Sequence, residues 1–386
     1  MRIGILTFHR AINYGAVMQA HSLSERIRKD YPNDIVEIVD YNCKQREIFK
    51  IKCPLVFLYR RSIKEGIEKA IQTGIFNRFV KRLGLSRPLL GVSDSKAQKF
   101  ISDNYDILIV GSDAVFNWND IGVPNVYFAN EVDVPHKLTF AASAHLQKYN
   151  QSSENDKQYI KDALSKFEYI GVRDASSEKF TESFYPDGEP VHNCDPTAFL
   201  NMNFPEDNLQ KKLRKHGFDF EKKTIFVMLM HPEIGELVKK RFGGEYQIVA
   251  LMDGNKYADM YLYDLNPFEW AHVFRYGSLV VTDYFHATML SIKNGTPVLS
   301  VDASGYCTED YQSKAYDLLN TRLSLPELYV NINDLKGSNG YETFCIRTED
   351  VLASFDADVV LRRMSAEAES YNSFGERLKK IHEEDK

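Results

Sequence analysis

The segment over residues 278–301 constrains the fold of this chain more than any other part of the sequence. It consists of an apolar run at 279–281, a short polar loop, a helical stretch closed by Asn294-Gly295, and a second apolar run at 297–301. This order is typical of a strand–helix–strand unit with parallel strands. The polar loop is therefore expected at the carboxyl end of a parallel strand, where open α/β sheets bind their ligands.

His286 lies where the helix of this unit is expected to begin. The free backbone N–H groups of a helix N-terminus favour an anion. A histidine held beside a bound anion tends to stay protonated, and it can then act as a general acid. A histidine that is hydrogen-bonded into the loop and has no chemical role fits the position equally well.

Strands and helices alternate along most of the chain, which is typical of parallel sheets covered by helices. A chain of 386 residues is long for one domain and sufficient for two. We expect an α/β fold with two Rossmann-like domains, residues 1–200 and 201–345, in a GT-B-like arrangement with an inter-domain cleft, and a C-terminal helical segment, 346–386, that packs back. Clefts between domains commonly hold small-molecule sites. The expected strands are 3–7, 35–40, 106–110, 138–144, 169–173, 190–194, 224–230, 246–252, 278–282 and 297–301.

Composition excludes several classes of function. The net charge is −6 and no long basic tract occurs, which argues against a nucleic-acid groove. The five cysteines are widely spread and form no C-x-x-C pair, so neither a disulfide framework nor a zinc site is predicted. No apolar run approaches the ~18 residues that a membrane-spanning helix needs. We expect a cytoplasmic protein with at most peripheral membrane contact.

Polar residues follow the expected strands of the first domain at their carboxyl ends. A glycine before a helix, such as Gly15, lets the backbone approach a ligand closely, but no G-x-G-x-x-G sequence supports a dinucleotide site. For Asn13, Ser112 and Ser143, capping a helix or closing a turn is the more common role. His9 and His145 also lie near strand ends, and we interpret both as structural. The candidate binding residues are Asn13, Tyr14 and Gly15 after the first strand, Ser112 and Asp113 after the third, and Ser143 after the fourth.

Arg173 is more informative because it ends an apolar strand. A charged group in that position has to be paired or has to reach a cleft, since burying an isolated charge is prohibitive. One interpretation is an ion pair with Asp174 or another carboxylate. The other is a guanidinium fork that binds a carboxylate or phosphate of a ligand in a bidentate manner.

The chain resembles the polysaccharide pyruvyl transferases. The resemblance rests on motifs that occur in the family's order from about residue 1 to 302. Ala287 stands where the family usually has glycine, and Ala114 where glutamine is common. The motifs lie at residues 4–20, 110–117 (Val-Gly-Ser-Asp-Ala-Val-Phe-Asn), 140–143 (Phe-Ala-Ala-Ser), 171–174 (Gly-Val-Arg-Asp), 194–197 (Cys-Asp-Pro-Thr) and 282–287 (Thr-Asp-Tyr-Phe-His-Ala).

The resemblance implies an enzyme that uses phosphoenolpyruvate to place pyruvate as a ketal on two hydroxyls of a sugar. By position, His286 matches the family's essential histidine and Arg173 its donor-binding arginine. His286 suits the protonation of the methylene carbon as a hydroxyl attacks C2, and Arg173 suits the donor's anionic groups. Asp283, Phe285 and Ala287 are placed beside the ligand with them. No metal or cofactor is implied, and phosphoenolpyruvate is a co-substrate.

The expected role is in surface or capsular polysaccharide biosynthesis, with a sugar acceptor that is free or lipid-linked. Asn13, Tyr14, Asp113 and Ser143 are candidates for binding its hydroxyls, and Asp113 is a candidate base. A GT-B-type glycosyltransferase that uses a nucleotide sugar and a non-catalytic glycan-binding relative are the two alternatives. The oligomeric state, the acceptor sugar and the bridged hydroxyl pair stay open.

Overall fold

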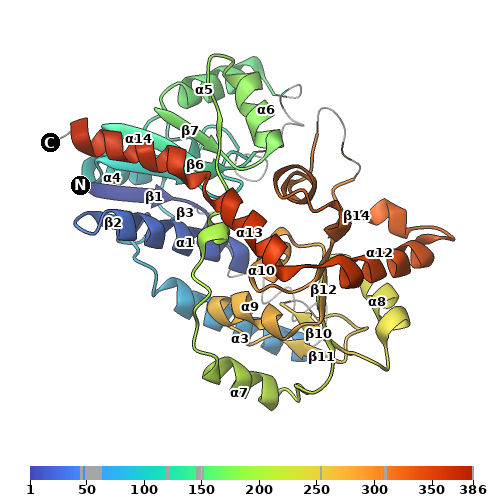
Figure 1. Ribbon diagram of the computed structural model, residues 1–386. Coiled ribbons are helices and arrows are strands. Elements are labelled where there is room, and N and C mark those ends of the chain that lie inside the picture. Colours follow the sequence, from blue (N-terminus) through green and yellow to red (C-terminus); the bar gives the residue numbers. More distant parts are fainter. Residues whose placement is uncertain are drawn as a thin grey trace. The chain divides into compact units, whose positions relative to one another are not determined.

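The computed structural model describes residues 1–43, 47, 63–117, 122–144, 149, 152–252, 254–305, 307 and 311–384. The chain divides into two units (Figure 1). Unit 1 comprises residues 1–66, 77–199 and 368–386, and unit 2 comprises residues 67–76 and 200–367. The sequence predicts a domain boundary at residue 200, and the structure changes from unit 1 to unit 2 after residue 199.

Unit 1 is built on a six-stranded parallel sheet with the strand order β2-β1-β5-β6-β7-β8. Every residue of β5 is buried, because apolar side chains cover both faces of a parallel strand between helices. The strands are β1 (Arg2–Leu6), β2 (Ile35–Ile38), β5 (Ile107–Gly111), β6 (His136–Ala142), β7 (Tyr169–Val172) and β8 (Val191–His192). The helices include α1 (Tyr14–Asp30), α4 (Asp94–Asn104), α5 (Glu154–Leu164) and α6 (Ala175–Phe184).

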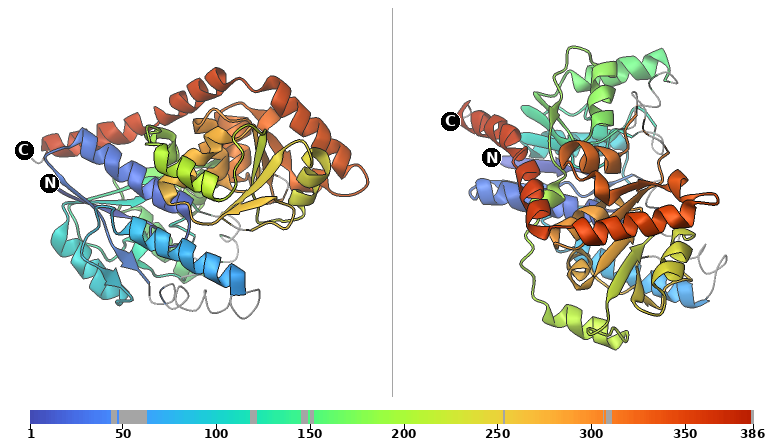
Figure 2. Two further views of the ribbon diagram at one scale, coloured as in Figure 1. Left: turned by 90° about the horizontal axis from the view of Figure 1, so that it is seen from below. Right: turned by 45° about the vertical axis from the view of Figure 1, so that its right-hand side comes forward.

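The two ends of the chain meet in unit 1, where the last helix, α14 (Tyr371–Glu384), lies close to the N-terminus (Figure 2). The ring of Phe374 lies 4.9 Å from that of Phe140 on β6. Asp34 accepts a hydrogen bond from the N-terminal amine at 2.9 Å and forms an ion pair with His382 of α14. The C-terminal helix is therefore part of the N-terminal unit.

Unit 2 contains a second six-stranded parallel sheet, with the order β11-β10-β9-β12-β13-β14. The strands are β9 (Thr224–Met228), β10 (Gln247–Leu251), β11 (Met260–Leu262), β12 (Leu279–Thr282), β13 (Val298–Asp302) and β14 (Tyr329–Asn331). The helices include α7 (Asp207–Lys215), α8 (Ile234–Phe242), α9 (Pro267–Val273) and α10 (Phe285–Lys293).

Each sheet has one point at which the strand order reverses. In unit 1 the chain runs from β1 outward to β2 and later continues from β5 on the other side of β1. In unit 2 it runs from β9 to β10 and β11 and later continues from β12 on the other side of β9. Ligands of open α/β sheets bind outside the carboxyl ends of the strands at such a switch point. A ligand site is therefore expected at the loops that follow β1 and β5 in unit 1, and at the loops that follow β9 and β12 in unit 2.

The sequence over residues 348–386 predicts one long helical stretch, whereas the structure divides the C-terminal segment. It forms α12 (Gly340–Ser354), α13 (Ala357–Ala368) and α14. The first break has a local cause, because the Asp356 side chain accepts a hydrogen bond from the Val359 N–H at 3.0 Å and thereby caps α13. Residues up to 367 belong to unit 2, and only the last helix belongs to unit 1.

A second difference concerns the helix α3 (Ile63–Val80), which the sequence places wholly in the first domain. Its residues 67–76 cluster with unit 2. Within that unit the Gln72 side-chain amide donates a hydrogen bond to the Met252 carbonyl at 2.9 Å. The helical spacing of the sequence predicts this helix over residues 59–83, and the first part of that range, 59–62, lies outside the described residues.

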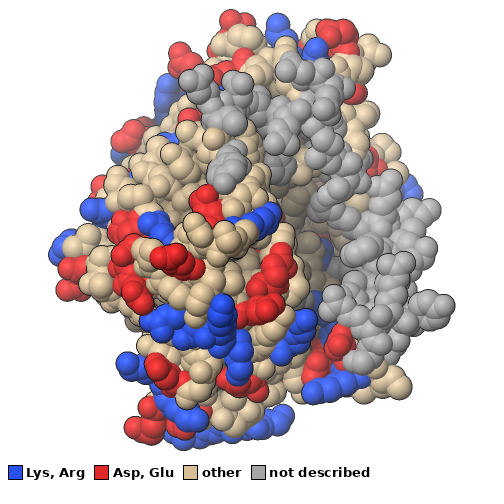
Figure 3. Space-filling view, turned by 90° about the vertical axis from the view of Figure 1, so that its right-hand side faces the viewer, with Lys and Arg blue, Asp and Glu red and all other residues tan. Residues whose placement is uncertain are grey.

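No helix in the described ranges is both long enough and apolar enough to span a bilayer. Basic and acidic side chains lie side by side on the face shown in Figure 3.

Candidate functional site

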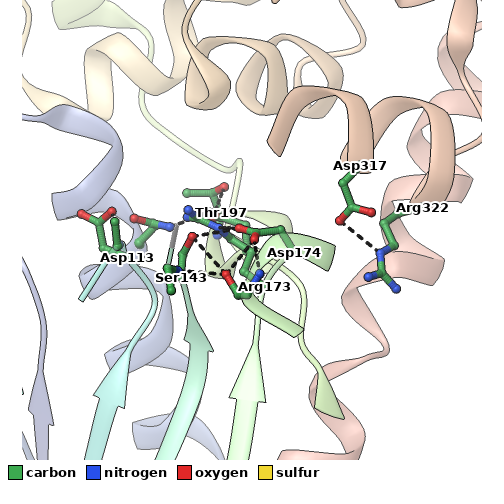
Figure 4. Close-up of polar contacts among 12 residues, drawn as sticks. Asp113, Ser143, Arg173, Asp174, Thr197, Asp317 and Arg322 are labelled. Atoms are coloured by element: carbon green, nitrogen blue, oxygen red, sulfur yellow. Dashed lines mark hydrogen bonds and ion pairs between the residues drawn. The ribbon is translucent and has the colours of Figure 1, made fainter. Parts of the chain in front are cut away.

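The carboxyl edge of the unit 1 sheet carries a buried charge cluster centred on Arg173, which follows β7 (Figure 4). The Arg173 guanidinium donates to Asp195 Oδ2 at 3.0 Å, and its Nε lies 3.7 Å from Asp174 Oδ2. Only 5% of Arg173 is exposed, against 2% of Asp174 and 4% of Asp195. The structure thus shows the ion-paired arrangement that was one of the two interpretations of this arginine.

Asp195, which follows β8, accepts further hydrogen bonds besides the one from Arg173. Its Oδ2 also accepts from the buried side-chain amide of Gln19 at 2.5 Å. Its Oδ1 accepts from the backbone N–H and the hydroxyl of Thr197, at 3.0 and 2.7 Å. Four donors from three elements therefore hold one buried carboxylate, as the burial of a charge requires.

Asp174 caps α6, and the sequence predicts this cap because Asp174 precedes a helical stretch whose first turn is acidic. Its Oδ1 accepts from the Ser177 backbone N–H at 3.0 Å, which satisfies a free donor of the first helical turn. Its Oδ2 accepts from the Ser143 hydroxyl at 2.8 Å. The predicted ligand-binding serine is itself fully buried, so it ties the end of β6 to the start of α6.

The balance of charge in the cluster is negative. Burial alone would lower the pKa of Arg173, but the nearby carboxylates of Asp195, Asp174 and Asp113 outweigh that effect and raise the pKa above its ordinary value. Two carboxylates are thus ion-paired with the guanidinium, and a third, that of Asp113, acts on it electrostatically. An anion that approached Arg173 would have to compete with groups that are already in place.

The β1/β5 switch point of unit 1 holds the other candidate residues of the first domain. Asn13 is exposed and caps α1, its Oδ1 accepting from the Ala16 N–H at 3.3 Å, while the next two residues, Tyr14 and Gly15, are buried. Asp113 is partly exposed, and its side chain accepts from the Ala114 N–H at 2.7 Å.

Ser112 adopts an unusual conformation at the end of β5. Its φ of 71° is in the left-handed region, which residues with a side chain rarely adopt. Its hydroxyl is buried and has no hydrogen-bond partner among the described residues. The preceding Gly111 has φ 139°, and a Cβ there would lie 2.3 Å from the Phe140 carbonyl oxygen, so this turn requires glycine.

The structure describes one of the two histidines, His9 and His145, that the sequence places near strand ends of the first domain. His9 is fully buried, with one ring nitrogen 3.0 Å from Asp40 Oδ1 and the other 3.2 Å from the Thr7 carbonyl oxygen. This environment fits the structural role that the sequence suggests. His145 lies outside the described residues.

The β12–α10 loop of unit 2 places His286 in the first turn of α10, as the sequence predicts. Tyr284 is the N-cap residue, and His286 and its neighbour Phe285 are partly exposed. Ala287, which stands where the family usually has glycine, is fully buried. Its methyl group therefore lies in the core.

Asp283 lies directly before this helix and has a supporting role. Its Oδ1 accepts from the Met230 N–H at 2.8 Å, and its Oδ2 accepts from the His231 N–H at 2.9 Å. The His231 ring is also bonded to it, with Nδ1 at 2.9 Å from Oδ2. The Asp283 side chain is completely buried. Both of its oxygens accept hydrogen bonds from the loop after β9.

The sequence interpretation did not single out His231. It lies three residues after the end of β9, on the carboxyl side of the strand, and the same rule that selected Ser112 and Ser143 would have selected it. Its link to Asp283 spans 52 positions and has no signature in the sequence. The sequence-predicted residues therefore form two sets, Asp113, Ser143 and Arg173 in unit 1 and Asp283, Phe285 and His286 in unit 2.

Comparisons with known proteins bear on the family and the fold of this chain. A family model described as polysaccharide pyruvyl transferase matches residues 13–305. A comparison with curated protein sequences found no significant match.

Solved structures with a similar fold include UDP-N-acetylglucosamine 2-epimerases. The putative enzyme of Listeria monocytogenes has a TM-score of 0.55 at 10% identity, over 99% of this chain and 97% of that one. The Methanocaldococcus jannaschii enzyme has 0.53 at 10%, over 97% and 99%. The Neisseria meningitidis enzyme, bound to UDP-GlcNAc, has 0.51 at 8%, over 98% and 100%. This likeness confirms the predicted GT-B-like fold class and, at such identities, shows the fold alone.

Proposed function

The chain belongs to the polysaccharide pyruvyl transferase family, and on that premise we propose that it transfers pyruvate from phosphoenolpyruvate to two hydroxyls of a sugar, forming a ketal during surface or capsular polysaccharide biosynthesis. The observation that carries the proposal is the position of His286. This histidine is partly exposed in the first turn of α10, beside the switch point of the unit 2 sheet. It lies within the matched segment, and by the resemblance of the motif at 282–287 it corresponds to the family's essential histidine.

The chemistry of the donor suits this position. Phosphoenolpyruvate carries a carboxylate and a phosphate, and the first-turn N–H groups of the nine-residue helix α10 favour an anion. When a hydroxyl oxygen attacks C2, the methylene carbon C3 must take up a proton. A histidine in the first turn of that helix is placed to supply it to a donor bound there. In this proposal His286 is the general acid.

Arg173 enters the proposal through its match to the family's donor-binding arginine. Its ion pairs with Asp174 and Asp195 fix the guanidinium. Donor binding at Arg173 therefore requires the donor to compete with two carboxylates. Asp113, partly exposed at the switch point of unit 1, is proposed to bind an acceptor hydroxyl.

The proposal is tested by calorimetric titration of phosphoenolpyruvate into the purified protein, with a competing titration of UDP-GlcNAc. We expect micromolar-to-millimolar binding of phosphoenolpyruvate, weakened in the His286→Ala variant. The control is His216→Ala, which lies in the same unit and pairs with Asp264 away from the switch point. Binding of UDP-GlcNAc without binding of phosphoenolpyruvate would contradict the proposal and favour the nucleotide-sugar glycosyltransferase. The epimerase of Neisseria meningitidis binds that ligand on a similar fold.

A further inference from the structure

The described residues include five ion pairs between a histidine and a carboxylate, and one of them is unlike the rest. In four pairs the histidine side chain is between 0% and 14% exposed. In the fifth, His231 is 39% exposed while its partner Asp283 is 0% exposed. An accessible imidazole on a buried carboxylate is the arrangement that proton transfer to a ligand requires. The other four pairs are His9–Asp40, His136–Glu168, His216–Asp264 and His382–Asp34.

The contacts of Asp283 show which way the imidazole is held. The carboxylate already accepts two backbone N–H bonds, from Met230 and His231, at 2.8 and 2.9 Å. A carboxylate can only accept, so Nδ1 of His231, at 2.9 Å, must be the donor of the third bond. The hydrogen on Nδ1 leaves Nε2 with a lone pair when the ring is neutral. The loop is held further by the Thr282 hydroxyl, which donates to the Met228 carbonyl at 2.7 Å.

The location of the pair is the switch point of unit 2. His231 follows β9 and Asp283 follows β12, and these strands are neighbours with Met228 paired to Thr282. The helix that begins two residues after Asp283 carries His286 in its first turn. His231, in the loop after β9, and His286, in the first turn of α10, are therefore two partly exposed histidines at the edge of the sheet where a ligand is expected.

We propose that His231, oriented by Asp283, is a second catalytic residue, which accepts the proton of the attacking sugar hydroxyl at Nε2. Asp283 is a positioning residue in this assignment. The inference rests on the proposed function, because that reaction needs a group that accepts a proton as well as one that donates it.

Together the two histidines account for every proton that is transferred in the reaction. In the first step the oxygen of one hydroxyl bonds to C2 of phosphoenolpyruvate and its proton passes to His231, while the C2–C3 π pair takes a proton from the His286 imidazolium at C3. In the second step another hydroxyl oxygen bonds to C2 and its proton passes to His286. The bond from C2 to the phosphate oxygen breaks with its electron pair on phosphate, which takes the proton from His231. Both histidines return to their starting forms, and the products are the ketal and monohydrogen phosphate.

A purely structural role for His231 explains the contacts less well. The two backbone N–H groups would satisfy Asp283 oxygens even without the imidazole. The third bond therefore orients the ring. A ring that served only as a cap would gain nothing from its exposure to solvent.

The first test is independent of the reaction. Protein labelled with ¹⁵N-histidine is titrated by NMR, and the His231 signals are assigned by their loss in His231→Gln. We expect the neutral His231 ring to carry its hydrogen on Nδ1. A neutral ring with its hydrogen on Nε2 would overturn the inference, because that nitrogen could not accept a proton.

The second test measures phosphate release from phosphoenolpyruvate with a panel of aryl glycosides (galactoside, glucoside, mannoside and N-acetylhexosaminides) as acceptors. His231→Gln should lower kcat by roughly 10²-fold or more, abolish the fall in rate at low pH, and leave the melting temperature unchanged. His216→Gln should retain wild-type activity. A His231→Gln variant with half or more of the wild-type rate and an unchanged pH profile would overturn the inference. If the wild-type protein neither binds phosphoenolpyruvate nor turns it over, the proposed function fails, and the NMR result alone decides whether His231 is an oriented proton acceptor.

Discussion

The carboxyl edges of the two sheets carry polar clusters of opposite character. In unit 1, Arg173 and its partners Asp174 and Asp195 are all at most 5% exposed. In unit 2 the carboxylate of Asp283 is buried in the same way, but the imidazole of His231 that it holds is 39% exposed. Both clusters lie where parallel strands end, and only the second lies at the switch point of its sheet.

This difference separates two uses of buried charge. A network in which every member is buried is costly to disrupt, and its members are not free to exchange protons with a ligand. A buried carboxylate under an accessible imidazole orients a group that can exchange protons. We therefore assign the proton transfers to unit 2, and we expect the charges of unit 1 chiefly to hold the strand ends in place.

The largest effect on stability is expected for Arg173→Leu. The substitution leaves Asp174 and Asp195 buried without their cation, and breaking a buried pair in this way costs about 3–5 kcal/mol. Urea unfolding measures the loss. The matched control is Arg241→Leu, which removes an ion pair to Glu349 between side chains that are 31% and 63% exposed, and which should cost less than about 1 kcal/mol. Equal stabilities of the two variants would contradict the claim that the buried charges of unit 1 hold its strand ends in place.

Much of this arrangement could be predicted from local sequence signals. The cap formed by Asp174 and the helix start at His286 each depend on a few adjacent residues, and both predictions are confirmed. The main strands agree with their predicted positions to within a few residues, because long apolar runs give a strong signal. The strands β11 and β14, of three residues each, were missed because they are too short to give one.

Contacts between distant segments could not be predicted in the same way. Arg173 was expected to pair with Asp174 or another carboxylate, but Asp195 lies 22 positions further along the chain. The bond between His231 and Asp283 spans 52 positions. In both cases the sheet topology, which brings the ends of neighbouring strands together, creates the contact.

A smaller effect is expected for Ser143→Ala. This change removes the hydroxyl that donates to Asp174 Oδ2 at 2.8 Å in a fully buried environment. A hydrogen bond to a charged group contributes about 1.5–3 kcal/mol. Thermal unfolding measures the loss of stability, and Ser165→Ala, at an exposed position, is the control. A loss of activity without a loss of stability would instead support direct ligand binding by Ser143 and would break the comparison.

The smallest effect concerns the pH dependence of stability through Asp40. Burial would raise the pKa of this carboxyl, but hydrogen bonds from His9 and Arg10 outweigh it and hold the pKa below its ordinary value. A carboxyl whose pKa is lower in the folded state stabilises the fold above its unfolded pKa, about 3.9. The contribution is lost as the pH falls from that value through the folded one. Urea unfolding between pH 7 and pH 3 should therefore show a weaker pH dependence for Asp40→Asn than for the wild type. An unchanged dependence would contradict the assignment.

The central claim, that a proton carrier in unit 2 protonates C3 of phosphoenolpyruvate, is tested most directly by running the reaction in D₂O with the aryl glycoside panel and analysing the products by mass spectrometry. Because an imidazolium exchanges its hydrogen with solvent, the account predicts an acceptor that gains a pyruvyl ketal with one deuterium in its methyl group. This product should be lost in His286→Gln and retained in His216→Gln. A glycosylated acceptor without a pyruvyl group, or a deuterated ketal formed equally well by His286→Gln, would contradict it.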